Sequence, residues 1–177
     1  HWTLQDDAQQ RMNDYAKALK FQLGVNFQLS ENHSIGANYR LNRMPYSDGK
    51  FDAFQKYKVW ADGQDFDNMD TYFLMKLGNT TQQFNFYYNG MIAEKLSIDF
   101  NFDYVKGDSY QNQKVDEQST EQESRTVTSF SNADYDLYAG KLVLSYPLGN
   151  GSVNVGGEMI NTNRNSDYYT LEDIVSP

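Results

Sequence analysis

The sequence predicts an all-β fold, an antiparallel up-and-down meander of about six long strands in three hairpins. Apolar and polar residues alternate strictly over residues 19–29, which places all the apolar side chains on one face of a strand. The alternation returns over residues 96–104, and again on both sides of a Pro, Gly and Asn cluster at 147–151. This recurrence predicts strands that each have one apolar and one polar face.

The first predicted hairpin covers residues 15–44, with a turn at 30–33. Its apolar residues occupy alternate positions, namely Leu19, Phe21, Leu23, Val25, Phe27 and Leu29, then Ile35, Ala37, Tyr39 and Leu41. Residues 6–19 suit either a short helix or an extended lead-in to the first strand. We expect the extended form, because the β-alternation begins at its end.

The second and third predicted hairpins cover residues 69–106 and 126–164. In the second hairpin we expect the turn to begin at Asn89 and Gly90, and in the third the turn falls at 147–151. The stretches 45–68 and 107–124 are polar, and we predict them as long loops between the hairpins. Within the first of these stretches, residues 51–60 either extend the second strand or form a separate one.

The composition argues against several classes of function. The chain has 177 residues, no cysteine, two histidines and a net charge of −9. The negative charge disfavours contact with phosphate backbones, so we expect no nucleic-acid partner. The lack of cysteine excludes disulfides, thiolate metal sites and cysteine nucleophiles from this sequence. Aromatic residues make up 15% of the chain, in contrast to the aromatic-poor composition of disordered proteins.

The length of the alternating strands indicates a membrane. Tilted strands of nine to eleven residues cross a bilayer, with apolar side chains toward lipid and polar ones toward the lumen. We therefore predict that residues 1–177 form one segment of a transmembrane β-barrel wall. Six strands are fewer than the eight of the smallest single-chain barrels, so the wall needs either further strands or further copies. The alternative is a soluble or surface-exposed β-sheet binding module whose apolar face packs on a second sheet.

Two blocks of residues resemble a known family. Residues 138–158, YAGKLVLSYPLGNGSVNVGGE, resemble the strand, turn and strand of Bacteroidetes-type outer-membrane β-barrel proteins grouped with TonB-dependent receptors. The pattern D-x-x-Y-P-L-G-x-G and a later glycine are matched by Tyr146, Pro147, Leu148, Gly149, Gly151 and Gly157, with Val143 in place of the Asp. Residues 85–104 are similar to the family's L-S-x-D-x-x-x-D-Y strand, matched by Leu96, Ser97, Asp99, Asp103 and Tyr104.

The resemblance implies a wall of about twenty-two strands around a plug domain in the outer membrane of a Gram-negative cell. It further implies a receptor or transporter for an unidentified extracellular ligand, with uptake driven by a TonB-type energy-coupling partner. The expected partners are therefore the lipid bilayer, the rest of the barrel, a plug domain and that energy-coupling protein. Neither a plug nor a box that would bind the coupling partner is visible in the sequence.

Aromatic residues are the best candidates for ligand contact. Phe51, Phe54, Tyr57 and Trp60 fall in the first polar stretch, and we select Tyr57 and Trp60 as ligand-binding residues. The alternative is that these rings only pack against neighbouring loops. Tyrosines near the strand ends, Tyr87, Tyr88, Tyr104 and Tyr146, are expected to form aromatic girdles at the membrane surface.

Carboxylates supply the other candidates. The acidic stretch Asp62–Asp70 suggests either a calcium loop or a solvated acidic loop, although it does not fit the EF-hand pattern. Asp99 and Asp103 share the polar face of one strand, which suits a hydrated lumen better than the acid and base of a glycosidase. His1 and His33 offer neither a metal site nor a catalytic base. We therefore expect no enzyme activity, no cofactor and no metal.

Overall fold

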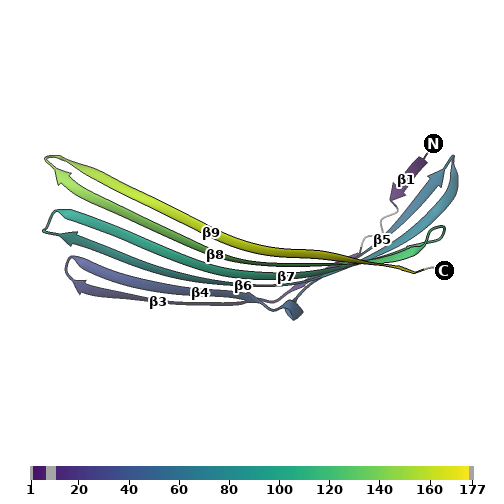
Figure 1. The fold of residues 1–177 in the computed structure, drawn as a ribbon, viewed down its shortest axis with the longest axis horizontal. Coiled ribbons are helices and arrows are strands. Elements are labelled where there is room, and N and C mark those ends of the chain that lie inside the picture. Colours follow the sequence, from purple (N-terminus) through teal and green to yellow (C-terminus); the bar gives the residue numbers. More distant parts are fainter. Residues whose placement is uncertain (1, 7–10, 176–177) are drawn as a thin grey trace.

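A computed structural model describes residues 2–6 and 11–175, and in these ranges the chain forms one antiparallel β-sheet of nine strands (Figure 1). No α-helix occurs in the described residues, and the one 3₁₀ turn, η1, covers Tyr46–Asp48. The strands are β1 (Trp2–Asp6), β2 (Arg11–Ala16), β3 (Leu19–Ser30), β4 (His33–Met44), β5 (Gly49–Ala61), β6 (Gln64–Ile92), β7 (Leu96–Ser119), β8 (Ser124–Leu148) and β9 (Gly151–Val175).

The nine strands lie as six long rows. β1, β2 and β3 follow one another along the first row, because β1 and β2 pair with β5 while β3 pairs with β4. β4 and β5 form the second row, because both pair with the single long strand β6. β6 then pairs with β7, β7 with β8, and β8 with β9. The predicted all-β antiparallel meander is confirmed, but it consists of nine strands in six rows rather than six strands. The predicted lead-in is extended where β2 covers it.

The two stretches predicted as long loops are strands instead. Residues 45–68 hold β5 and the start of β6, and residues 107–124 hold the end of β7. The prediction was wrong because polarity was taken as a sign of irregular structure. Polar residues pair across these strands, and the Asp62–Gly63 turn needs only two residues, with φ of 51° and 83°. Two positive φ angles are what a type I′ hairpin turn requires, and Asp-Gly is a preferred sequence for it.

The second row is interrupted where η1 separates β4 from β5. At this point the backbone passes close to β6, because a Cβ built on Gly78 would lie 2.7 Å from the backbone nitrogen of Tyr46. Only glycine leaves room for this approach. Residues 51–60 therefore belong to a strand that continues the line of β4 beyond a short break.

The turns at the other end of the sheet are short. β3 and β4 are joined by residues 31–32, β6 and β7 by residues 93–95, and β8 and β9 by Gly149 and Asn150. Gly149 has a φ of 59°, as the first position of a type II′ turn requires. The turn expected at Asn89 and Gly90 lies three residues later, because both residues still pair with β7.

The sheet is a single layer. Among the described residues no apolar side chain is buried, and large apolar side chains such as Leu23 and Met159 are 64% and 70% exposed. The sheet is not closed into a barrel, since β3 and β9 each have a pairing partner on one side only within the described chain. The residues that would normally form a core therefore lie on an open face.

Candidate functional site

One face of the sheet carries an apolar band at the end with the short turns. We call this face the band face. Strand alternation and pairing register place on it, row by row, Leu19 to Leu29 at odd positions, Ile35 to Leu41 at odd positions, Phe84 to Ile92 at even positions, Leu96 to Tyr104 at even positions, Tyr138 to Tyr146 at even positions, and Val153 to Met159 at odd positions. The two alternating runs that the sequence singles out thus share one face.

The band is as tall as a bilayer crossing. It covers nine residues of β7, from Leu96 to Tyr104, and eleven of β3, within the range that a tilted transmembrane strand needs. On the same face the next side chains along the rows are polar, at Arg43, Gln82, Lys106, Asp136 and Asn161. The apolar surface therefore ends at a similar height in five neighbouring rows.

We call this end of the band, away from the short turns, its upper border. Aromatic rings form a row across the sheet there. Tyr39, Phe84, Tyr104 and Tyr138 are neighbours in register, with ring centroids 4.8, 6.1 and 4.8 Å apart. Two of the hydroxyls donate to polar side chains just beyond the band: Tyr39 to Gln82 at 3.1 Å and Tyr104 to Asp136 at 2.6 Å. Rings in an apolar layer with hydroxyls directed at polar groups are typical of an apolar–water interface.

The two tyrosines near the short turns, Tyr87 and Tyr88, lie on opposite faces of the sheet. Tyr88 lies on the band face, and its hydroxyl is 2.7 Å from Nδ1 of His33. Tyr87 lies on the opposite face, over Gly36, where a Cβ would be 2.1 Å from the tyrosine ring. The assignment of Tyr87 to a girdle on the apolar side was therefore wrong, since neighbouring residues of a strand point to opposite faces.

Opposite the band, polar side chains form a hydrogen-bonded ladder, and we call this the ladder face. Asn85 donates to the Oδ1 atoms of Asn101 and Asp103 at 2.9 and 3.0 Å, and Asn101 donates to Oδ2 of Asp103 at 2.8 Å. Asn38 and Gln83 make longer bonds to Asn85 and Asp103, both 3.4 Å. Amide donors from β6 and β7 thus hold the Asp103 carboxylate, and Asn38 of β4 joins the ladder through Asn85.

The ladder borders a polar hollow of about 220 Å³. Its lining is Gln22, Asn38, Arg40, Gln83, Asn85 and Asp103. The sequence analysis recognised Asp99 and Asp103 but not their amide neighbours, although these occupy the alternate positions to the apolar residues. Asp99 pairs with Asn89 and Val143 and lines a separate hollow near the turns, so the two carboxylates belong to different parts of the face.

Beyond the band the distribution of charge changes. Ion pairs now lie on the band face, between Lys50 and Asp52 at 3.3 Å, Lys56 and Asp70 at 3.2 Å, and Lys114 and Asp116 at 2.9 Å. The ladder face carries an apolar patch there, which consists of Phe51, Ala53, Phe73, Met75, Val115 and Val127. We call this part of the sheet the extension.

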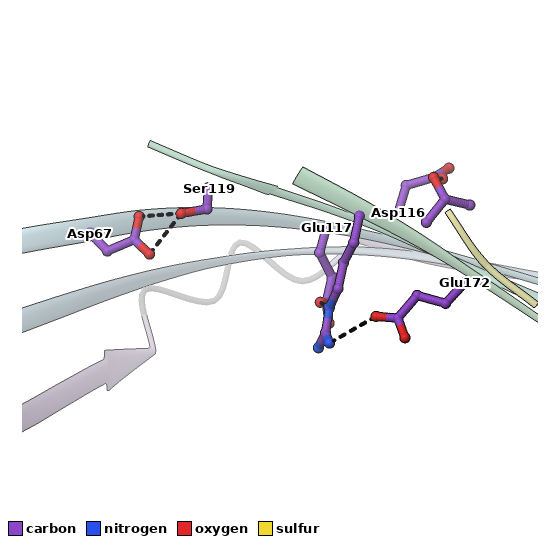
Figure 2. A network of polar contacts seen from close by, with 7 residues as sticks. Asp67, Asp116, Glu117, Ser119 and Glu172 are labelled. Carbon is purple, nitrogen blue, oxygen red and sulfur yellow. Dashed lines mark hydrogen bonds and ion pairs between the residues drawn. The ribbon is translucent and has the colours of Figure 1, made fainter. Parts of the chain in front are cut away.

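The extension contains one buried carboxylate, that of Asp67, which is 2% exposed. The Ser119 hydroxyl donates to the Asp67 carboxylate and lies 2.8 Å from each of its oxygens (Figure 2). Oδ1 also accepts hydrogen bonds from the Thr120 and Glu121 backbone amides at 3.1 and 3.3 Å. The Thr120 hydroxyl donates to the same atom at 3.1 Å. These contacts tie the turn between β7 and β8 to the top of β6, and we call them the Asp67 clasp.

Hydrogen bonding governs the charge state of the clasp. Burial alone would raise the pKa of Asp67, but the hydrogen bonds from Ser119, Thr120 and Glu121 outweigh burial and hold the pKa below its usual value. The carboxylate is therefore ionised at neutral pH. The sequence offers no signal for this contact, because the partners lie 52 to 54 residues apart.

The candidate ligand residues do not share a surface. Tyr57 pairs with Met69 and lies on the ladder face, whereas strand alternation directs Trp60, three positions further along β5, to the other face. The register shift between Val59 and Trp60 leaves the extra residue, Phe66, on β6. Phe51 and Phe54 are divided in the same way, and Phe51 packs against Phe73 with ring centroids 5.7 Å apart. The spacing of three that brings rings together on a helix separates them on a strand, so the four aromatics do not form one stacking platform.

The acidic stretch 62–70 is a hairpin turn followed by a strand. Asp67 is engaged in the clasp and Asp70 pairs with Lys56, so these two carboxylates serve different contacts. Among the described residues no three His, Asp or Glu side chains converge on a point where a metal ion would bind. The stretch is therefore a tight turn and a paired strand rather than a loop, and residues 62–66 and 68 are exposed.

No family model matches the chain, and no curated protein sequence is significantly similar to it. Within residues 2–6 and 11–175 no helix is long and apolar enough to cross a membrane.

Proposed function

We propose that this chain is a section of an outer-membrane β-barrel wall that belongs to a receptor or transporter. The observation that carries the proposal is the apolar band, whose height is similar across the rows and whose upper edge is a row of tyrosines and phenylalanine. Behind the band the ladder face is polar and hydrogen-bonded, as the lining of a hydrated lumen would be. A face this apolar and this exposed needs either lipid or another protein layer to cover it.

The functional part of the proposal is TonB-dependent uptake of an extracellular ligand. Its support is the resemblance of residues 138–158 and 85–104 to the turn and strand patterns of that receptor family. Further strands would pair with the open edges of β3 and β9, and the ladder face would look toward a plug domain. The polar hollow beside Arg40 and Asp103 then lies on the path of the ligand.

Spin labels at neighbouring positions test the membrane part of the proposal. The sequence contains no cysteine, so single cysteines at Val25 and Asn26, and at Phe102 and Asn101, give four clean labelling sites. In vesicles we expect labels at Val25 and Phe102 to be accessible to oxygen and shielded from a water-soluble nickel complex. Labels at Asn26 and Asn101 should show the reverse.

The competing proposal, a soluble binding module, predicts a different result. A second protein layer over the band would shield Val25 and Phe102 from both oxygen and nickel, and the chain would stay monodisperse without detergent. That outcome would overturn the assignment to a barrel wall. For energy coupling, loss of ligand uptake on deletion of the cell's TonB-type protein is the expected result, and uptake that continues unchanged would contradict it.

A further inference from the structure

The band face is not uniformly filled, and an apolar groove lies over Ala37 of β4. The groove has a volume of about 670 Å³ and its floor is Ala37. Leu23 and Val25 of β3 form one wall, and Phe84, Phe86 and Phe102 of β6 and β7 form the other. Because a methyl group stands between large side chains in the neighbouring rows, the groove is open and apolar.

Beyond Ala37, the same face of β4 carries Tyr39 and Leu41 and then a cation, Arg43, at the upper border. Arg43 lies on the same face of β4, six residues beyond Ala37 and two beyond Leu41. Arg43 is exposed and forms no ion pair with any described residue. Lys17, also beyond the upper border, adds a second cation near this part of the sheet, and its Nζ lies 5.6 Å from the centroid of the Tyr15 ring. Lys17 also has the Asp48 carboxylate as an electrostatic neighbour, so Arg43 is the cation that the upper border offers to an anionic group.

We propose that this groove binds an anionic phospholipid, with one acyl chain along Ala37 and the phosphate beside Arg43. The inference rests on the proposed function, since it requires the band to face lipid. The dimensions agree, because six strand residues span about 20 Å. At a tilt of about 45° this corresponds to about 14 Å of depth, close to half of the hydrocarbon core. A chain held at Arg43 would thus reach Ala37 near the bilayer centre.

The same face provides a matched contrast at β8 and β9. A Cβ built on Gly140 or Gly157 would meet no atom within 4 Å, so the band is also open there. Along β8, however, the residues beyond Tyr138 on this face are Asp136 and Asp134. The band face thus has two open apolar sites. The site at Ala37 has a cation at its upper border, whereas the site at Gly140 has two carboxylates there. Charge complementarity favours an anionic headgroup at the first site and disfavours it at the second.

Brominated lipids and single tryptophans test this assignment. Phe86, in the wall of the groove, and Leu142, which pairs with Gly157, are both 41% exposed, so Phe86→Trp and Leu142→Trp report on the two sites from similar positions. Both are made in a background in which Trp2 and Trp60 are replaced by Phe. Each protein is reconstituted in phosphatidylcholine vesicles that contain a minor fraction of brominated phosphatidylglycerol or, in parallel, brominated phosphatidylcholine.

For the indole at position 86 we expect brominated phosphatidylglycerol to be enriched about five-fold over phosphatidylcholine, the factor given by about 1 kcal/mol per cationic side chain at a membrane surface. The indole at position 142 should show no such preference. Adding Arg43→Gln should remove the preference at position 86 while quenching by phosphatidylcholine persists. Adding Ala37→Phe should fill the groove and reduce quenching by both lipids there.

The outcomes separate this inference from the proposed function. Equal quenching by the two lipids at position 86, or a preference that survives Arg43→Gln, overturns the lipid site while strong quenching by phosphatidylcholine still supports the barrel wall. Absence of quenching by either lipid at both positions, in protein whose circular dichroism shows an intact sheet, overturns the barrel wall and the lipid site together.

Discussion

Replacing Asp67 by alanine is expected to loosen the turn between β7 and β8. The carboxylate accepts hydrogen bonds from two backbone amides and two hydroxyls of the turn. Hydrogen bonds to a charged group contribute about 1.5–3 kcal/mol each, but the freed donors lie in an exposed turn where water replaces part of that energy. We therefore expect a loss of about 2–3 kcal/mol of local stability from Asp67→Ala.

Amide hydrogen exchange measures this loss directly. A change of about 2–3 kcal/mol corresponds to about 30- to 150-fold faster exchange at Thr120 and Glu121. Asp70→Ala is the matched control, because the Asp70 carboxylate is exposed and pairs only with the exposed Lys56, an interaction worth about 0.2–1 kcal/mol. Unchanged exchange at Thr120 and Glu121 in Asp67→Ala would refute the reasoning.

The same clasp predicts a pH dependence with a defined sign. The folded pKa of Asp67 lies below the ordinary value of 3.8, so the clasp stabilises the turn fully above that value. This contribution is lost as pH falls through the lower, folded pKa. Protection at Thr120 should therefore persist at about pH 5 and fall only below about 3.8. In Asp67→Asn, which has no charge to lose, protection should be lower throughout and insensitive to this step.

Two further predictions concern the band and the break between β4 and β5. Phe100→Arg places a charge in the middle of the band and is expected to lower the free energy of unfolding in vesicles by about 2–4 kcal/mol. Asn101→Arg, on the ladder face, should lower it by less than about 1 kcal/mol. Equal losses of stability would contradict a lipid-facing band. Gly78→Ala forces the backbone of η1 away from β6 and should lower the free energy of unfolding by about 1–3 kcal/mol. Gly140→Ala places its Cβ with no atom within 4 Å, so it should be neutral or stabilising by up to about 1 kcal/mol. Urea titration of the two variants compares their free energies of unfolding.

Periodicity predicted the part of the fold in which one face is apolar. The runs at 19–29 and 96–104 lie in β3 and β7, and their apolar residues share the band face as the alternation predicts. The extension was missed because the alternation weakens there. Residues 106–119 contain few apolar side chains on either face, and residues 72–75 are apolar at consecutive positions. A stronger signal was present at Asp62–Gly63, whose two residues are typical of a tight hairpin turn.

The candidate site also has features that periodicity predicts and features that depend on contacts between strands. The alternate positions of one strand were enough to assign Asp103 to a polar face. Two of the amides that hold its carboxylate, those of Gln83 and Asn85, come from β6 and depend on register. The break at η1 shifts the pairing of β5 relative to β4, and no local pattern reports it. Tyr57 and Trp60 were grouped by distance along the chain, whereas a strand separates residues three apart.

The change of polarity between the band and the extension has a consequence for folding. β6 is 29 residues long, and a strand of this length that slipped by one residue and turned over could re-form most of its backbone hydrogen bonds in the wrong register. Such a slip would turn Phe84 and Phe86 toward the ladder and, in the same movement, turn Phe73 and Met75 toward the ion pairs. A register slip therefore places apolar side chains on a polar face in both halves of β6, and each half destabilises the slipped pairing on its own. A strand with an apolar face in one half only would be destabilised once.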